Sequence, residues 1–97
     1  MAQFDVFRLR SGMLVVDLQT DLIGMEASRM VAPLREAARY AAFPGLTPMV
    51  EVEGKVWIVA VQAMAALPGA ELRDFVTSLA SERDVLKRAV DVLFDGF

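Results

Sequence analysis

The sequence contains neither cysteine nor histidine among its 97 residues. Without cysteine there is no disulfide framework of the kind that stabilises many small secreted domains, so we expect a cytoplasmic protein. Without histidine the commonest zinc-ligand sets are excluded, as are catalytic triads in which imidazole is the general base. Phosphate-binding glycine loops, nucleophile-elbow motifs and zinc-protease motifs are also missing. We therefore expect a protein that is not an enzyme.

An excess of positive charge is missing as well. The chain has 10 Lys and Arg against 13 Asp and Glu, which gives a net charge of −3. This is not the charge pattern of a protein that binds nucleic acid or anionic lipid unaided. The longest apolar stretch, residues 56–70, contains Gln62 and Pro68-Gly69 and is shorter than the ~20 residues of a membrane span. The first residues do not resemble a signal peptide, and we expect no membrane association.

Apolar residues are abundant and make up 56% of the chain. A chain of this length is expected to form one domain, which we assign to residues 1–97. A domain of this size buries only about 60–65% of its unfolded surface, so its own stability is modest. The high apolar content has two explanations, which are a well-filled core and an apolar surface shared between subunits.

Five segments have strand character because β-branched and other apolar residues dominate them. They are residues 4–10, 13–19, 29–34, 48–53 and 55–62. We expect Ser11-Gly12 to form a two-residue hairpin turn between the first two strands, and Glu53-Gly54 to join the last two. The third strand is expected to end near Pro33. The last strand is nearly all apolar, which indicates a central position.

The remaining segments contain helical patterns of unequal strength. Residues 35–43 favour a helix by propensity, and residues 70–79 fit either a helix or a strand. The clearest helix covers residues 82–94, with Ser81 as the expected N-cap and one apolar stripe. Strands followed by a final helix predict a mainly β or α+β fold, in which a small antiparallel barrel or sheet packs against the helix.

Several polar and aromatic residues permit two interpretations. Asp17 is surrounded by apolar residues, so its carboxylate either faces water or is buried with a partner. Acid–base chemistry by this group is the less favoured role, and the other acidic candidates are Asp21, Glu51 and Glu53. We expect Arg29, Arg35 and Arg39 to be solvated, with an RNA-phosphate contact as the alternative. Trp57, the only tryptophan, is expected in the core, with a surface hot spot as the alternative.

The last four residues are unusual for the end of a helix. Gly96 suits the position after the last helical residue, and Phe97 is then placed to contact Val92 in a Schellman ending. Asp91 and Asp95, however, lie in or beside the last turn, where the helix dipole disfavours each by roughly 0.3–1 kcal/mol. An apolar terminal residue is also explained by anchoring in a partner or by packing across a dimer axis.

Several sequence blocks lie in a familiar order and at familiar spacing over nearly the full chain. They are Gln3-Phe4-x-Val6, Leu14 to Ile23, Arg29 to Leu34, Leu46 to Val50, Trp57, Met64-Ala65, Leu67-Pro68 and Leu93 to Phe97. Through these blocks the chain resembles the CcdB family, the toxins of bacterial toxin–antitoxin modules that poison DNA gyrase. The resemblance implies a small SH3-like barrel, the CcdB/PemK-like toxin fold, with a long C-terminal α-helix. It also implies a homodimer without cofactor or catalytic turnover.

The resemblance further implies partners and a target-binding site. Family members bind the A subunit of gyrase and trap the enzyme on cleaved DNA, and an antitoxin with a disordered C-terminal segment neutralises them. The matching positions in this chain are Leu22, Ile23, Asp91, Asp95, Gly96 and Phe97. Asp91 replaces a family asparagine, and Phe97 replaces an aliphatic residue.

Asp95 is the main departure from the family pattern. It stands where the best-known members have a tryptophan that stacks between arginines of the two gyrase subunits. Losing such an anchor costs about 2 kcal/mol or more, although a carboxylate can still pair with a guanidinium. The expectation is therefore a gyrase-binding toxin, with lost or redirected toxicity as the alternative. A toxin endoribonuclease on the related barrel is less favoured.

Overall fold

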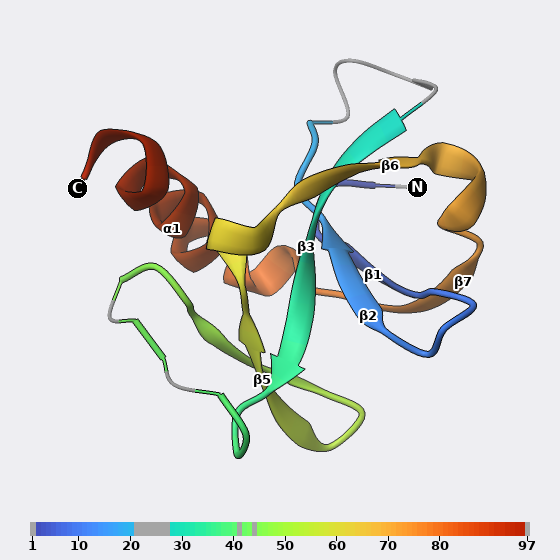
Figure 1. The fold of residues 1–97 in the computed structure, drawn as a ribbon, viewed down its shortest axis with the longest axis horizontal. Helices are drawn as coiled ribbons and strands as arrows, with labels where there is room; N and C mark the ends of the chain where they lie inside the picture. The colour runs from blue at the N-terminus through green and yellow to red at the C-terminus, as the bar shows by residue number, and fades with distance from the viewer. Residues whose placement is uncertain (1, 21–27, 41, 44, 97) are drawn as a thin grey trace.

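The chain folds into a strongly curled antiparallel sheet with a helix at its C-terminal end (Figure 1). The computed structural model describes residues 2–20, 28–40, 42–43 and 45–96. The strands are β1 (Asp5–Arg8), β2 (Leu14–Asp17), β3 (Ser28–Glu36), β4 (Met49–Val52), β5 (Lys55–Val59), β6 (Ala65–Pro68) and β7 (Asp74–Ser78). Short 3-10 helices are η2 (Val61–Ala63), η3 (Gly69–Glu71) and η4 (Ala80–Glu82), and the α-helix is α1 (Arg83–Asp95). The predicted class, mainly β or α+β with an SH3-like barrel, is confirmed.

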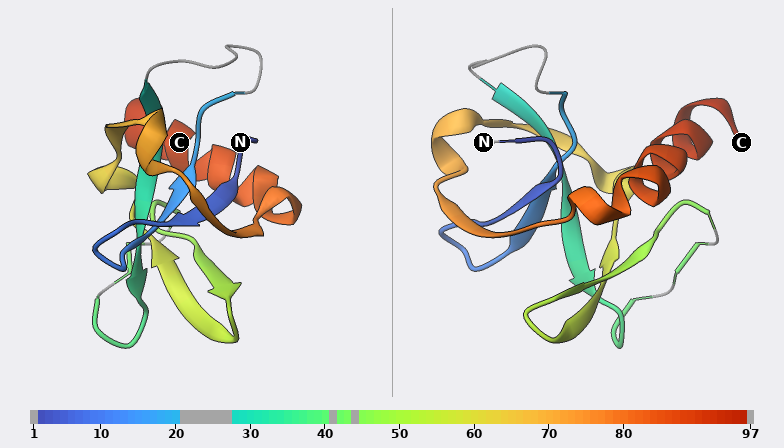
Figure 2. Two further views of the ribbon diagram at one scale, coloured as in Figure 1. Left: turned by 90° about the vertical axis from the view of Figure 1, so that its right-hand side faces the viewer. Right: turned by 180° about the vertical axis from the view of Figure 1, so that it is seen from behind.

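The sheet has the strand order β4-β5-β3-β2-β1-β7, with β6 paired to the first half of β3. The long strand β3 therefore belongs to both halves of the fold, since its end pairs with β5 and its middle with β2. The rotated views in Figure 2 show β3 running the height of the molecule between the two hairpins. Residues 70–79, which the sequence left undecided, contain η3 and the edge strand β7.

The expected end of the third strand at Pro33 was wrong. Pro33 lies inside β3 opposite Val15, and its carbonyl accepts a hydrogen bond of 2.9 Å from the backbone N–H of Ala60. In an antiparallel strand the N–H and C=O of one residue point to the same side. On that side β3 changes its partner from β6 to β5 between Val31 and Leu34. The N–H group that proline lacks would therefore lie between the two ladders, where neither ladder requires a donor.

The predicted helix over residues 35–43 was also wrong. Arg35 and Glu36 are the last residues of β3, where they pair with Ile58 and Trp57 of β5, and residues 37–40 form a turn and bend. Helix propensity is a weak preference of a few tenths of a kcal/mol per residue, and pairing with a buried strand outweighs it. The consequence is that β5 lies between two strands, as its apolar composition predicted.

The two hairpins use different turns. In β4–β5, Val52 pairs with Lys55, and Glu53 and Gly54 both have positive φ (54° and 75°), which is the predicted two-residue turn. The β1–β2 turn is longer than predicted. The Leu9 N–H donates to the Met13 carbonyl at 2.8 Å, which leaves a loop of residues 10–12 that ends on Gly12 at φ 94°.

The main core lies between the curled sheet and α1. It is built from aliphatic side chains of β1 to β5 together with Leu86 and Ala89 of the helix, which are 0% and 1% exposed. These two residues follow the apolar stripe predicted for the helix. Trp57 is half-buried at the edge of this core, and its indole N–H donates to the Val52 carbonyl at 3.2 Å. Trp57 was predicted to lie in the core, and it packs against the core at its edge.

The predicted N-cap of the helix was wrong. Helix α1 begins at Arg83, and Ser81 lies in η4 before it. No side chain caps the first turn, because η4 leads directly into the helix and Glu82 occupies the cap position. Within the described part of the chain, no helix has the length and apolar character needed to cross a membrane.

Candidate functional site

The C-terminal end of α1 is an exposed, acidic helix terminus. Gly96 has φ 83°, and its N–H donates to the Val92 carbonyl at 2.9 Å. This single bond is the αL form of helix ending, which confirms Gly96 as the residue after the helix. The expected contact between Phe97 and Val92 involves a residue outside the described ones and stays a prediction.

Two carboxylates and one aromatic ring surround this terminus. Asp91 and Asp95 are both exposed and four positions apart, so they lie on one side of the helix about one turn from each other. Phe94 is 71% exposed, an unusual state for a large apolar side chain. The last turn contains no basic residue, so the negative end of the helix dipole adds to the two carboxylates. The terminus is therefore suited to bind a cationic group.

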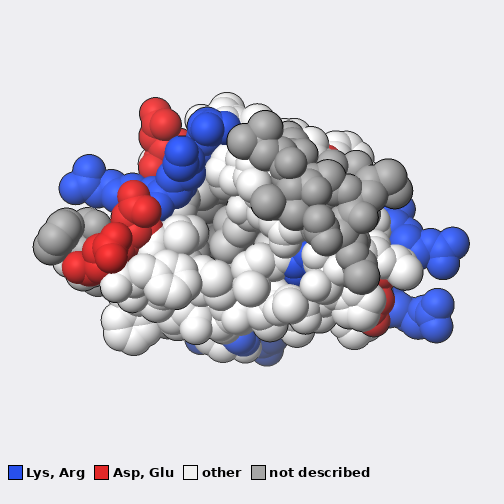
Figure 3. Space-filling view, turned by 90° about the horizontal axis from the view of Figure 1, so that it is seen from above, with Lys and Arg blue, Asp and Glu red and all other residues white. Residues whose placement is uncertain are grey.

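A shallow hollow of about 490 Å³ continues this surface along the outer side of the helix. It is lined by Asp84, Val85, Lys87, Arg88 and Asp91. Val85, which is 47% exposed, is the apolar residue of this lining. Figure 3 shows acidic and basic side chains together at the helix end of the molecule. Asp91 belongs both to this hollow and to the helix terminus, so one partner can contact both.

Leu22 and Ile23, the other predicted target-binding residues, lie outside the described residues, as does Phe97. The structure therefore brings together Asp91, Asp95 and Gly96 at one helix end, and the target-binding role of all six residues stays a prediction.

A buried ion pair joins β2 to β3. The Asp17 carboxylate is 0% exposed. Its Oδ2 accepts a hydrogen bond from Arg29 Nε at 2.9 Å and lies 2.8 Å from Arg29 Nη2 in an ion pair. Its Oδ1 accepts the backbone N–H of Gln19 at 3.0 Å. Of the two alternatives left open for Asp17, burial with a partner is thus the one found, and the acid–base role is unsupported because both oxygens are occupied. The solvated position expected for Arg29 was wrong, since Arg29 is 3% exposed.

The same network continues through Gln19. Its carbonyl accepts a bond from Arg29 Nη2 at 3.2 Å, and its side-chain Oε1 accepts the Met30 N–H at 3.1 Å. The Leu18 N–H donates to the Met30 carbonyl at 2.9 Å. These bonds connect the two described segments that flank residues 21–27. This network was not predicted from the sequence, although Asp17, Gln19 and Arg29 all lie in the blocks that carried the resemblance.

The other charged candidates within the described part of the chain are exposed or partly exposed, and Asp21 lies outside the described residues. Glu51 is exposed, and Glu53 pairs with Arg8. Arg35 lies over the ring of Tyr40 at 5.3 Å, and Arg39 is exposed in the turn after β3. Among the described residues, no three acidic side chains are close enough together to hold a metal ion. The residues of the described chain that best fit a binding role therefore remain those at the end of α1.

Two comparisons with known proteins bear on this surface. The family model described as CcdB protein matches residues 3–96 of the chain, which include Asp91, Asp95 and Gly96. Among solved structures, the Mycobacterium tuberculosis toxin MazF-mt6 is similar to the chain with a TM-score of 0.75. The two are 18% identical, and the alignment covers 94% of each chain. At this identity the likeness to MazF-mt6 shows the fold alone.

Proposed function

The chain belongs to the CcdB protein family, and on this premise we propose that it binds the A subunit of DNA gyrase and traps the enzyme on cleaved DNA. Membership makes it a toxin of the toxin–antitoxin type. The observation that carries the proposal is the extent of the match, which covers residues 3–96 and so includes the exposed end of α1. Gyrase as target places the proposed action in the cytoplasm.

The end of α1 supports this proposal through its charge and exposure. Asp91 and Asp95 project from one side of the last two turns and have no ion pair within the described part of the chain. Each can accept charge-assisted hydrogen bonds from an arginine of the target. Gly96 in the αL conformation ends the helix at this point, so the last turn of α1 is open to contact by a partner.

We further propose that the chain works as a homodimer and acts by binding rather than by catalysis. Phe94 and Val85, which are 71% and 47% exposed, are apolar surface that a second subunit or a target can cover. A dimer would present two acidic helix ends to the two A subunits of one gyrase. The antitoxin partner follows from the family, and we propose that a disordered C-terminal segment of it covers the same surface.

Asp95 in place of the family tryptophan supports a weakened form of this activity. An aspartate at this exposed position retains polar contacts to arginine but provides no aromatic surface for stacking. We therefore propose that gyrase binding is retained and that trapping on cleaved DNA is less efficient than with tryptophan. Loss or redirection of toxicity is the alternative that this residue favours.

A gyrase cleavage and supercoiling assay with purified proteins tests the proposal. The native chain is expected to stabilise cleaved DNA at micromolar dimer, and Asp95→Trp is expected to do so at lower concentration. Glu71→Trp is the matched control, since Glu71 is also an exposed acidic residue but lies in η3, across the molecule from the end of α1 (Figure 1). Absence of any effect of the native chain on gyrase would refute the proposed target. Cleavage of total RNA by the native chain would instead refute action without catalysis.

If only Asp95→Trp traps gyrase, the native chain has lost this toxicity and the alternative is correct. Equal gains from Asp95→Trp and Glu71→Trp would mean that any added aromatic surface on the protein strengthens binding. In that case the helix end is not the specific target-binding site.

A further inference from the structure

Phe4 has an unusual backbone conformation for a buried aromatic residue. Its φ is 72°, in the left-handed region, and its side chain is only 3% exposed. This conformation is costly for a residue with a side chain, and it persists only where the surrounding structure holds it. The Phe4 N–H donates to the Asp17 carbonyl at 2.6 Å, and the Phe4 carbonyl accepts the Leu79 N–H at 2.8 Å. The first of these bonds joins the strained residue to the end of β2.

The end of β2 is bound to two other segments of the chain. Gln3 Nε2 donates to the Leu18 carbonyl at 3.1 Å, which adds a second bond from the N-terminal segment. The regular ladder between β2 and β3 ends at the pair of Asp17 with Val31. Beyond it, the bonds of Leu18 and Gln19 to Met30 continue the connection. The chain is therefore held more firmly here than the ladder alone requires.

These features do not give the greatest stability to this part of the sheet. A buried ion pair such as Asp17–Arg29 is often no more stabilising than apolar side chains of similar volume. A left-handed phenylalanine adds strain that a glycine would not have. Departures of this kind from the rules of stability are expected chiefly at functional sites. Their occurrence together at the end of β2 therefore points to a role beyond folding.

The position of the network in the sequence indicates what that role is. The network joins residues 17–19 to residues 29–30, which precede and follow residues 21–27. Leu22 and Ile23, two of the predicted target-binding residues, belong to this interval of the sequence. The Asp17–Arg29 pair and the bond from Met30 to Gln19 fix the relative position of the two ends of the interval.

We propose that Asp17, Gln19 and Arg29 are positioning residues for target binding, which act by fixing the ends of residues 20–28 and so the placement of Leu22 and Ile23. This inference rests on the proposed function and on the predicted roles of Leu22 and Ile23. A binding segment whose ends are fixed in advance loses less conformational entropy when the target binds. Hydrogen bonds and ion pairs suit this purpose because they require a definite geometry, and binding sites must be held to within about 0.5 Å.

Two test variants separate positioning from stability. The double variant Asp17→Leu, Arg29→Met removes the ion pair without leaving an unpaired buried charge, so its midpoint of unfolding is expected within about 1 M urea of the native value. Gln19→Met removes the acceptor of the Met30 N–H, which water can replace because this bond is exposed. Gln19→Glu retains an acceptor oxygen at the same side-chain length and is the rescue variant.

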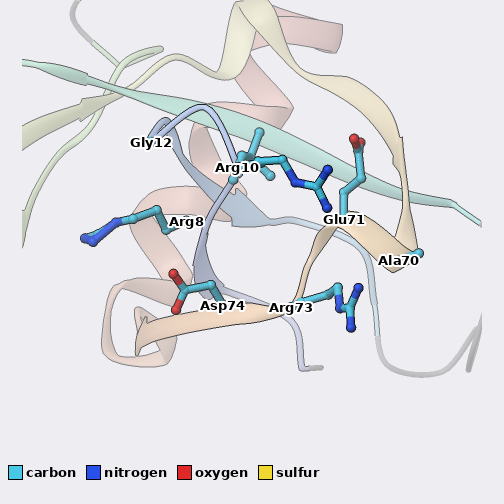
Figure 4. A pocket seen from close by; sticks show the side chains of 8 residues that line it. Arg8, Arg10, Gly12, Ala70, Glu71, Arg73 and Asp74 are labelled. Carbon is cyan, nitrogen blue, oxygen red and sulfur yellow. The ribbon is translucent and has the colours of Figure 1, made fainter.

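The matched control removes an ion pair elsewhere in the sheet. Arg8→Met with Glu53→Gln breaks the pair between β1 and the β4–β5 turn, and like the double test variant it leaves the net charge unchanged. The β4–β5 turn lies at the opposite end of β3 from Ser28 (Figure 1). Arg8 also lines a hollow of about 640 Å³, where two arginines and two carboxylates balance each other, namely Arg10, Arg73, Glu71 and Asp74 (Figure 4). The control therefore leaves the charges of this hollow balanced.

Gyrase trapping in the cleavage assay is the functional readout. The double test variant and Gln19→Met are each expected to require about tenfold more protein than the native chain for equal cleavage. Gln19→Glu and the control are expected to trap gyrase as the native chain does. A purely structural role predicts instead that trapping follows the midpoint of urea unfolding. Equal trapping by the native chain and Gln19→Met would overturn the inference.

Hydrogen exchange measured by mass spectrometry is a second readout, which does not require gyrase. Exchange in a peptic fragment covering residues 20–28 is expected to be faster in Gln19→Met than in the native chain and in Gln19→Glu. Unchanged exchange in this fragment would overturn the positioning role even if trapping falls. If the native chain does not trap gyrase but exchange in this fragment rises in Gln19→Met, the proposed target fails and the positioning of residues 20–28 stands.

Discussion

Removal of Arg29 is expected to destabilise the fold more than any surface change. The substitution Arg29→Met keeps most of the side-chain length and removes the guanidinium, which leaves the Asp17 carboxylate without its ionic partner. Asp17 is 0% exposed, and it would retain only the 3.0 Å bond from the Gln19 N–H among the bonds described above. An unpaired buried charge of this kind costs about 3–5 kcal/mol.

This loss is large relative to the stability of the chain. Ordinary domains of this length have an unfolding free energy of about 5–15 kcal/mol. With a urea dependence of about 1.3 kcal/mol per molar, the midpoint of unfolding is expected to fall by roughly 2–4 M. Trp57, the single tryptophan, lies half-buried against the core and provides the fluorescence signal. All variants are compared at one protein concentration, because a dimer links stability to concentration.

The double variant Asp17→Leu, Arg29→Met separates charge from packing. With both charges removed, the unfolding free energy is expected to recover to within about 1 kcal/mol of the native value, with the remaining loss at the Gln19 N–H, which has no acceptor. Arg39→Met is the surface control and is expected to change stability by less than about 0.5 kcal/mol. If the double variant is as unstable as Arg29→Met alone, the uncompensated carboxylate is not the cause and the reasoning is refuted.

Further predictions concern the helix and the tryptophan. Gly96→Ala forces alanine to φ near 83° and is expected to cost about 1 kcal/mol, seen as a fall in Tm of about 4–8 °C. Asp95→Lys places a cation at the helix C-terminus and is expected to raise stability by about 0.3–1 kcal/mol in urea unfolding, while gyrase trapping falls. Ser81→Ala is expected to change the Tm by less than 2 °C or so, because no side chain caps the helix; a loss near 1 kcal/mol would show a cap after all. Trp57→Phe loses the bond to the Val52 carbonyl and is expected to cost about 0.5–1.5 kcal/mol by circular dichroism.

Local patterns predicted the elements that depend on local interactions. The β4–β5 hairpin was predictable because Glu53-Gly54 fits a two-residue turn with positive φ at both positions. The apolar stripe of α1 was predictable because its period alone determines which residues face the core. The absence of a side-chain N-cap was not predictable from the local pattern, since η4 before the helix is positioned by the strand that precedes it.

Features that depend on strand pairing were not predictable from the sequence. Residues 35–36 extend β3 only because β5 lies beside them, and Arg29 is buried only because β3 places it against Asp17. The candidate site divides in the same way. Asp91, Asp95 and Gly96 were found because they share one helix end, whereas the bonds of Gln19 to Arg29 and Met30 arise only through the pairing of β2 with β3.

The pairing of β1 with β7 also limits when the toxin can fold during its synthesis on the ribosome. Residues 5–8 cannot find their outer partner until residues 74–78 have been synthesised, and the core cannot close until Leu86 and Ala89 follow. Folds dominated by such distant contacts form slowly, on the scale of milliseconds to seconds. The toxin is therefore expected to reach its native shape only after α1 has been synthesised.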